Sequence, residues 1–303
     1  MNRIRTREYK GWIYKGLEWT PSNPEGDEFQ RMLSEKGELI LTCQGRDIYR
    51  LNFNLDGAPC CCFLYIFRNT SLTRAFKTSY AYQTLRISNT IRKLGFPSIE
   101  VLAAIRPKNE LLNWNSLLIA KEILNVEELS ATGNHVYKVH ASIPFSGEVA
   151  ALTASELARF HDSNLFHGDL KSRHILISEN PDKESPSIWF VDLEKTRHHK
   201  LLPPFLRDIL AARDLIQLLS SLPGNKNGDS AQEEKSRFLS LYLSNRNLSR
   251  KRSGTIKKAV SLYLESGSLR QGETLLQGIM RGIKERVSGG TDDGKQGRFK
   301  TPN

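Results

Sequence analysis

Residues 166–177 read FHGDLKSRHILI, and residues 187–193 read SIWFVDL. The first stretch places Asp169 and Lys171 in a polar segment directly before an apolar run that is typical of a buried strand. The second stretch is another short strand, and it ends at Asp192. Turn-forming residues fill the interval between the two, so we expect paired strands with a loop-borne carboxylate beside each.

Two loop-borne carboxylates and a lysine are the groups that phosphoryl transfer requires. One carboxylate accepts the hydroxyl proton of the acceptor, the other holds Mg²⁺ on the nucleotide phosphates, and the lysine meets the charge of the transferred group. The tetrapeptide HGDL is a weak signal by itself, whereas its place between a helix and two strands is specific. The alternatives are a solvated ion pair for Asp169 and Lys171 and a turn residue for Asp192.

The preceding part of the chain is typical of a small antiparallel sheet with one helix. Asp56 and Gly57 separate two strand-like runs and predict a tight hairpin. Apolar residues at helical spacing predict a helix over 80–94, capped by Thr78 or Ser79. Strands are expected at 37–42, 46–55, 60–67, 99–105 and 116–124.

From about residue 150 the pattern becomes mainly helical. Thr153 and Glu156 form a capping-box pattern at the start of a helix that leads into HGDL. We predict an α+β, two-lobed fold with further helices at 205–222, 233–243, 254–264 and 273–287. The expected parts are an N-terminal extension (1–36), a small antiparallel-sheet lobe with one helix (37–122), a mainly α-helical lobe with the catalytic loop (123–286) and a disordered tail (287–303).

Composition narrows the setting and the partners. The 44 Lys and Arg against 33 Asp and Glu give a net charge of +11, which favours an anionic partner. The basic start lacks an apolar segment behind it, so neither a signal peptide nor a membrane span is indicated. Three adjacent cysteines and one distant cysteine fit neither a disulfide framework nor a zinc site, and we expect a reducing, cytoplasmic environment.

Residues 160–197 resemble the bacterial lipopolysaccharide core kinases, the Kdo/WaaP and heptose kinase family, which have a protein-kinase-like fold. The resemblance extends more weakly over about 35–220. IRKLGFPSIEVLAA is similar to the family's small-lobe helix exit, and LLIAKEI is similar to its interlobe hinge. RDLIQLL is similar to the helix that anchors its catalytic loop.

The resemblance implies a role for each matching residue. Asp169 would be the catalytic base, His167 would brace the loop, and Lys171 would lie near the γ-phosphate of ATP. Asp192 would ligate Mg²⁺, and Asp214 would hydrogen-bond the catalytic loop from below.

His174 stands where protein kinases place an asparagine that coordinates a second metal, and the heptose kinases resemble this chain in having histidine there. Mg²⁺ prefers oxygen ligands, so contact with a nucleotide phosphate or bracing of the loop is favoured over direct ligation. His174 remains a candidate metal ligand beside Asp192.

The small lobe departs from the family pattern. Tyr65 stands where the phosphate-gripping lysine is expected, and Thr84 stands where its glutamate partner is expected. No GxGxxG loop precedes them, and only Gly45 offers a phosphate-covering turn. Arg68 is the candidate substitute cation, with an exposed cation at the sheet edge as the alternative.

The resemblance implies an ATP- and Mg²⁺-dependent kinase that phosphorylates a sugar hydroxyl, on Kdo or heptose, of a lipid-linked core oligosaccharide. Its place would be the cytoplasmic face of the inner membrane of a Gram-negative bacterium. Two alternatives remain open: a pseudokinase or scaffold without turnover, and a soluble small-molecule kinase of the aminoglycoside or choline type.

Residues 245–303 carry most of the basic excess, mixed with apolar residues. They predict basic amphipathic helices that bind an anionic membrane as a peripheral element, or else an ordinary solvated helix face. The basic run at 250–252 is too short to indicate nucleic acid, and the oligomeric state is left open.

Overall fold

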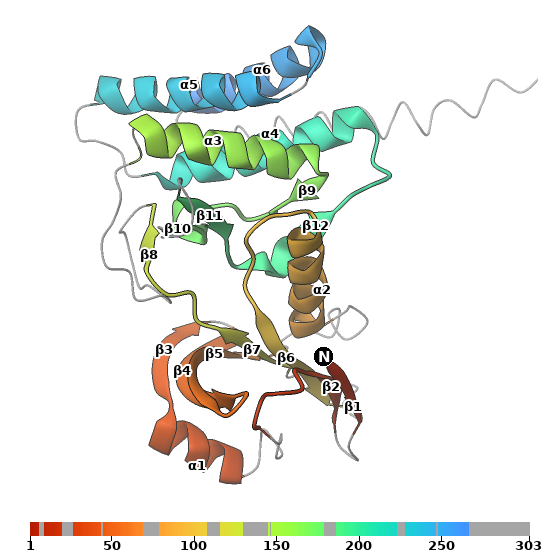
Figure 1. Cartoon of the computed structure of the whole chain (residues 1–303). Coiled ribbons are helices and arrows are strands. Elements are labelled where there is room, and N and C mark those ends of the chain that lie inside the picture. The colour runs from red at the N-terminus through yellow and green to blue at the C-terminus, as the bar shows by residue number, and fades with distance from the viewer. Residues whose placement is uncertain are drawn as a thin grey trace, which may run out of the picture.

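The structure is a computed structural model that places a sheet lobe beside a helical lobe (Figure 1). It describes residues 1–5, 9–19, 27–43, 45–68, 79–107, 116–129, 145, 147–178, 186–222, 228–246 and 248–266. The predicted α+β, two-lobed, kinase-like fold is confirmed. The proposed lobe bounds, 37–122 and 123–286, stay predictions.

The sheet of the small lobe is antiparallel throughout. In the described residues its strand order is β1-β2-β6-β7-β5-β4-β3. Residues 2–13, expected as part of an extension, contribute its first two strands, because β2 pairs with β6 along its whole length. The bounds are β1 Asn2–Arg5, β2 Tyr9–Ile13, β3 Glu38–Cys43, β4 Arg46–Leu55, β5 Ala58–Phe67, β6 Val101–Pro107 and β7 Ser116–Lys121.

Two local predictions in this lobe are confirmed. Asp56 and Gly57 join β4 to β5 with positive φ angles of 52° and 79°, as a tight hairpin turn requires. Helix α2 (Tyr80–Lys93) begins at Ser79, whose hydroxyl accepts a hydrogen bond from the Tyr82 amide. Thr78, the other predicted cap, lies outside the described residues. A second helix, α1 (Asp27–Lys36), precedes β3 and was not expected.

The helical lobe contains α3 (Gly147–Asp162), α4 (Pro204–Ser221), α5 (Gly228–Asn245) and α6 (Arg250–Ser266) (Figure 1). Its core continues into the small lobe: the ring of Phe160 on α3 contacts Phe96, which follows α2, and Phe190 on the strand before Asp192. All three side chains are buried, so the lobes share one apolar cluster at their junction.

The capping box at Thr153 and Glu156 is wrong. Helix α3 begins six residues earlier, at Gly147, and Thr153 lies buried in its second turn, where its hydroxyl has no hydrogen-bond partner among the described residues. Apolar packing on α3 outweighs the local preference of threonine for a helix start. The helix predicted at 273–287 and the tail lie outside the described residues.

Helix α6 uses its apolar face within the protein. Ile256, Ala259 and Val260 are buried in the core, whereas Lys257 and Lys258 are exposed. Over residues 250–261, whose side chains the structure describes, the apolar residues of this helix therefore face the core and its lysines face outward. Among the described helices, none has the length and apolar character that crossing a membrane requires.

Candidate active site

The HGDL segment is held between elements of the helical lobe. It follows α3 and β9 (Leu165–Phe166) and continues through a 3-10 turn, Ser172–His174, into β10 (Ile175–Ser178). Strand β10 pairs with β11 (Ser187–Phe190) and with β8 (Val126–Glu128), while β12 (Arg197–His198) pairs with β9. These pairings bring the HGDL loop and the segment after β11 side by side.

A buried carboxylate shapes the loop from below. Asp214 on α4 accepts hydrogen bonds from the backbone amides of His167 at 2.6 Å and Gly168 at 2.8 Å. Gly168 has a φ of 79°, and a Cβ there would lie 2.9 Å from the carbonyl oxygen of Lys195. Glycine is therefore required both by the backbone conformation and by this close approach.

Asp214 also terminates a buried polar chain. Its Oδ2 lies 3.3 Å from Nε2 of His161, and Nδ1 of His161 lies 2.7 Å from the Tyr242 hydroxyl, which accepts a hydrogen bond from Arg246. Burial lowers the pKa of His161, so the ring is neutral and donates through Nε2 while accepting through Nδ1. Arg246 in turn pairs with Asp162. Each of these five polar side chains therefore has a hydrogen-bond partner.

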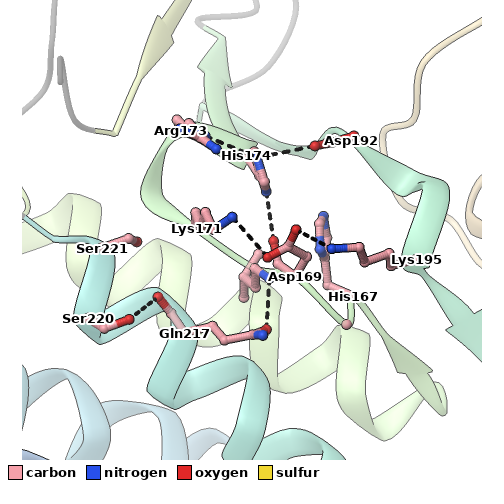
Figure 2. A network of polar contacts seen from close by, with 12 residues as sticks. His167, Asp169, Lys171, Arg173, His174, Asp192, Lys195, Gln217, Ser220 and Ser221 are labelled. Atoms are coloured by element: carbon pink, nitrogen blue, oxygen red, sulfur yellow. Dashed lines mark hydrogen bonds and ion pairs between the residues drawn. The ribbon is translucent and has the colours of Figure 1, made fainter. Parts of the chain in front are cut away.

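Asp169 lies above this support between two lysines (Figure 2). Its carboxylate oxygens lie 3.0 Å from Nζ of Lys171 and 2.8 Å from Nζ of Lys195. Burial alone would raise the pKa of Asp169, but hydrogen bonds from the two lysines hold it well below its usual range. The carboxylate is therefore ionised at neutral pH.

His174 braces the backbone of this residue. Its Nδ1 donates to the carbonyl oxygen of Asp169 at 2.7 Å, and its Nε2 lies 3.3 Å from both Nε of Arg173 and Oδ2 of Asp192. Burial lowers the pKa of His174 to about 4, so Nε2 is an acceptor at neutral pH. The lone pair on Nε2 of His174 therefore faces the carboxylate oxygen Oδ2 of Asp192.

His167 links the loop to the strand before Asp192. It is fully buried, and its Nε2 donates to the carbonyl oxygen of Val191 at 2.8 Å. Further along the loop, the amides of Leu170 and Ser172 donate to Gln217 and Ser221 of α4. Four backbone amides of the loop are therefore bonded to α4 side chains, if the two on Asp214 are included.

Asp192 has a left-handed backbone, with φ 60° and ψ 51°, a conformation that aspartate adopts more readily than most residues. Its Oδ1 lies 2.9 Å from Nη1 of Arg46, and the same nitrogen contacts Oε1 of Glu194. Arg46 begins β4 directly after Gly45, so this ion pair joins the small lobe to the segment after β11. Gln83 on α2 adds a hydrogen bond to the carbonyl oxygen of Glu194.

These carboxylates carry unequal charge. Burial and the charge of Asp192 together raise the pKa of Glu194 to about 7, although Arg46 opposes the shift. For Asp192, burial would raise the pKa, but the charge of Arg46 lowers it below its usual value. Asp192 is therefore the anion of the pair at neutral pH.

The donor set fits a magnesium ion that is shared with a nucleotide. The described residues contain no group of three or more His, Cys, Asp or Glu side chains able to hold a metal by themselves. Mg²⁺ is usually held by one or two carboxylates together with substrate phosphates. One carboxylate oxygen of Asp192 and one of Glu194 contact the same nitrogen of the Arg46 guanidinium. The two oxygens therefore converge on one point, as ligands of a metal ion must.

The two small-lobe positions at which a lysine–glutamate pair is expected carry uncharged side chains. Tyr65 is 8% exposed, lies in the apolar cluster and stacks on Phe67. Thr84 is buried on α2, and its hydroxyl has no hydrogen-bond partner in the described structure. Arg68 is exposed and pairs with Asp47, so it does not reach Asp192 here.

Comparison with known proteins decides the family. The model of the lipopolysaccharide kinase (Kdo/WaaP) family matches residues 64–242, more than half of the chain. The chain belongs to the lipopolysaccharide kinase (Kdo/WaaP) family. The match spans α2, the HGDL loop, Asp192 and Asp214, and it begins within β5, after Arg46.

A solved structure of WaaP supports the fold. The structure titled "WaaP in complex with acyl carrier protein" has a TM-score of 0.51 and 16% identity, covering 82% of this chain and 92% of that one. The PknI kinase domain of Mycobacterium tuberculosis (C20A_R136N double mutant) has a TM-score of 0.40 and 16% identity, covering 82% and 97%. No curated protein sequence matches the chain.

Sequence reasoning missed four residues of the candidate site of this Kdo/WaaP family member. Glu194 and Lys195 have a weak signal, since they follow Asp192 by two and three residues. Arg46 follows Gly45, the candidate phosphate-covering turn. The sequence nevertheless favours Arg68 as the phosphate-binding cation, because Arg68 follows the strand expected to carry the lysine. Gln83 has no signal, because its contact with Glu194 depends on how α2 packs.

We expect Asp214→Asn to lower the free energy of unfolding by about 3 kcal/mol, because an amide NH₂ would face a backbone N–H in a buried site. Chemical denaturation of both proteins measures the loss. Asp162→Asn is the matched control: its side chain is 38% exposed, and the expected loss is under about 1 kcal/mol. Equal losses would contradict the supporting role of Asp214.

Proposed function

We propose that the protein is an ATP- and Mg²⁺-dependent kinase that transfers phosphate to a sugar hydroxyl of the lipopolysaccharide core. The observation that carries the proposal is the convergence of two ionised carboxylates, Asp169 and Asp192, on neighbouring loops with lysines beside the first and an arginine beside the second. Membership of the family supports the same chemistry.

In this proposal Asp169 orients the acceptor hydroxyl. Its low pKa makes it a weak base, which suits a loose transition state in which little proton transfer is needed before the phosphoryl group moves. Lys171 and Lys195 hold the two carboxylate oxygens in place. Because both lysines are partly exposed, they can also turn toward the phosphoryl oxygens as negative charge moves onto them.

Asp192, with Glu194 beside it, would hold Mg²⁺, which neutralises charge on the β- and γ-phosphates when bound. His174 keeps its role in bracing Asp169 and is a weaker candidate for the metal, since its Nε2 already accepts from Arg173. His167 aligns the two loops through Val191, and Asp214 supports them from α4.

We assign the phosphate grip of the small lobe to Arg46 rather than to Arg68. Arg46 reaches the metal carboxylate from the turn that covers the site, whereas Arg68 points to Asp47. A guanidinium binds phosphate oxygens through two parallel hydrogen bonds, so it can take over the work of the missing lysine. Release from Asp192 and Glu194 would accompany nucleotide binding.

The acceptor is proposed as Kdo or heptose on a lipid-linked core oligosaccharide, at the cytoplasmic face of an inner membrane. Acyl carrier protein, named with WaaP in the similar structure, is a second partner to test. The pseudokinase alternative keeps one observation in its favour: Tyr65 and Thr84 occupy an apolar setting where kinases carry an ion pair.

We expect the purified chain to transfer labelled phosphate from Mg·ATP to truncated lipopolysaccharide cores. Asp169→Asn should lower kcat by about 10²- to 10⁴-fold, because the acceptor hydroxyl loses its orienting carboxylate. Asp56→Asn, in the β4–β5 turn, is the matched control and should leave kcat unchanged. Absence of transfer by the parent protein to every core would favour the pseudokinase.

We expect Arg46→Ala to raise the KM for ATP about tenfold or more, since it removes a charge-assisted contact to phosphate. Arg68→Ala makes the same substitution directly after the neighbouring strand β5 and should change the KM less than twofold. Steady-state kinetics at saturating acceptor measures both. A rise confined to Arg68→Ala would transfer the phosphate grip to Arg68.

A further inference from the structure

An apolar tip projects beside the active site. Residues 199–207 read HKLLPPFLR, and we call them the LLPPF loop. Leu201 is 97% exposed and Phe205 is 43% exposed, whereas Leu206 packs against the core. An isolated exposed leucine is ordinary, but here a second large apolar side chain, Phe205 in the first turn of α4, follows Leu201 by four residues, and solvent alone does not favour such a pair.

The loop is held rigidly at its base. Asn164, in the turn after α3, accepts a hydrogen bond from the His199 amide at 2.9 Å and another from Arg207 at 2.6 Å. Pro203 caps α4, and its carbonyl oxygen accepts the amide of Leu206. A loop closed at both ends and stiffened by proline presents its tip with little loss of conformational entropy on binding.

The surroundings of the tip are basic. Arg197, Lys200 and Arg213 are exposed before the loop, within it and on α4 after it. The one acidic residue from 195 to 213 is Asp208, and it is 2% exposed and paired in a bidentate contact with Arg252. The cations around the tip therefore have no neighbouring acid in that segment to neutralise them.

The tip also extends outward. Figure 1 shows the segment between β12 and α4 bowing away from the body of the helical lobe. A narrow projecting point offers little of the area that a stable protein–protein interface needs, whereas it can enter a soft apolar phase. Exposed apolar residues preceded along the chain by the exposed cations Arg197 and Lys200 match the acyl region and the anionic headgroups of a bilayer.

We propose that the LLPPF loop is a membrane anchor that inserts Leu201 and Phe205 into an anionic bilayer surface while Lys200 and Arg197 contact its headgroups. Because β12 pairs with β9 immediately before His167, the anchor holds the HGDL loop near the membrane plane. The inference rests on the proposed function in one respect: a lipid-linked acceptor is the reason for the protein to bind a membrane.

The test is co-sedimentation of the full-length protein with vesicles of phosphatidylcholine containing phosphatidylglycerol, and with vesicles of phosphatidylcholine alone. We expect binding to the anionic vesicles that weakens as salt rises, and at least tenfold weaker partitioning for Leu201→Glu/Phe205→Glu. The matched control is Leu39→Glu, which replaces an exposed leucine on β3 in the small lobe. This variant should bind the vesicles as the parent does.

Two further measurements distinguish a failure of this proposal from a failure of the kinase assignment. Transfer to a soluble, delipidated acceptor should be equal in the parent and the double variant, and equal thermal denaturation shows that both are folded. Unchanged vesicle binding in the double variant, no binding by the parent, or an equal loss in Leu39→Glu would overturn the anchor. Failure of phosphate transfer alone would leave the vesicle result standing.

Discussion

The carboxylate of Asp214 is the contact on which the site depends. A buried carboxylate is costly unless its oxygens are satisfied, and here two backbone amides and the neutral ring of His161 satisfy them. In return, the loop at His167 and Gly168 is fixed against α4. The direction in which Asp169 points, and the reach of His174 back to its carbonyl oxygen, both follow from that shape.

The second constraint lies between the lobes. Protein kinases carry a lysine–glutamate pair within the small lobe, and the residues expected at those positions here, Tyr65 and Thr84, are both buried. The segment that carries Asp192 is held from the small lobe by Arg46 and Gln83. These two contacts join the small lobe directly to the segment of Asp192 and Glu194 at the edge of the site.

The features predicted well from sequence are those whose physics is local. The Asp56–Gly57 turn needs positive φ at two successive residues, and the Ser79 cap lies next to the helix that it begins. Arg46 and Asp192 are separated by 146 positions, so no local pattern links them. Thr153 shows the opposite failure, since a valid local signal was overridden by the packing of α3.

The most direct test of this account is a calorimetric titration of ATP into the protein with and without Mg²⁺, repeated with Asp192→Ala. If Asp192 and Arg46 form a nucleotide-phosphate site, the parent binds ATP more tightly when Mg²⁺ is present. The variant should lose that gain. Absence of ATP binding by the parent in both conditions would contradict the assignment and leave a kinase fold without its nucleotide.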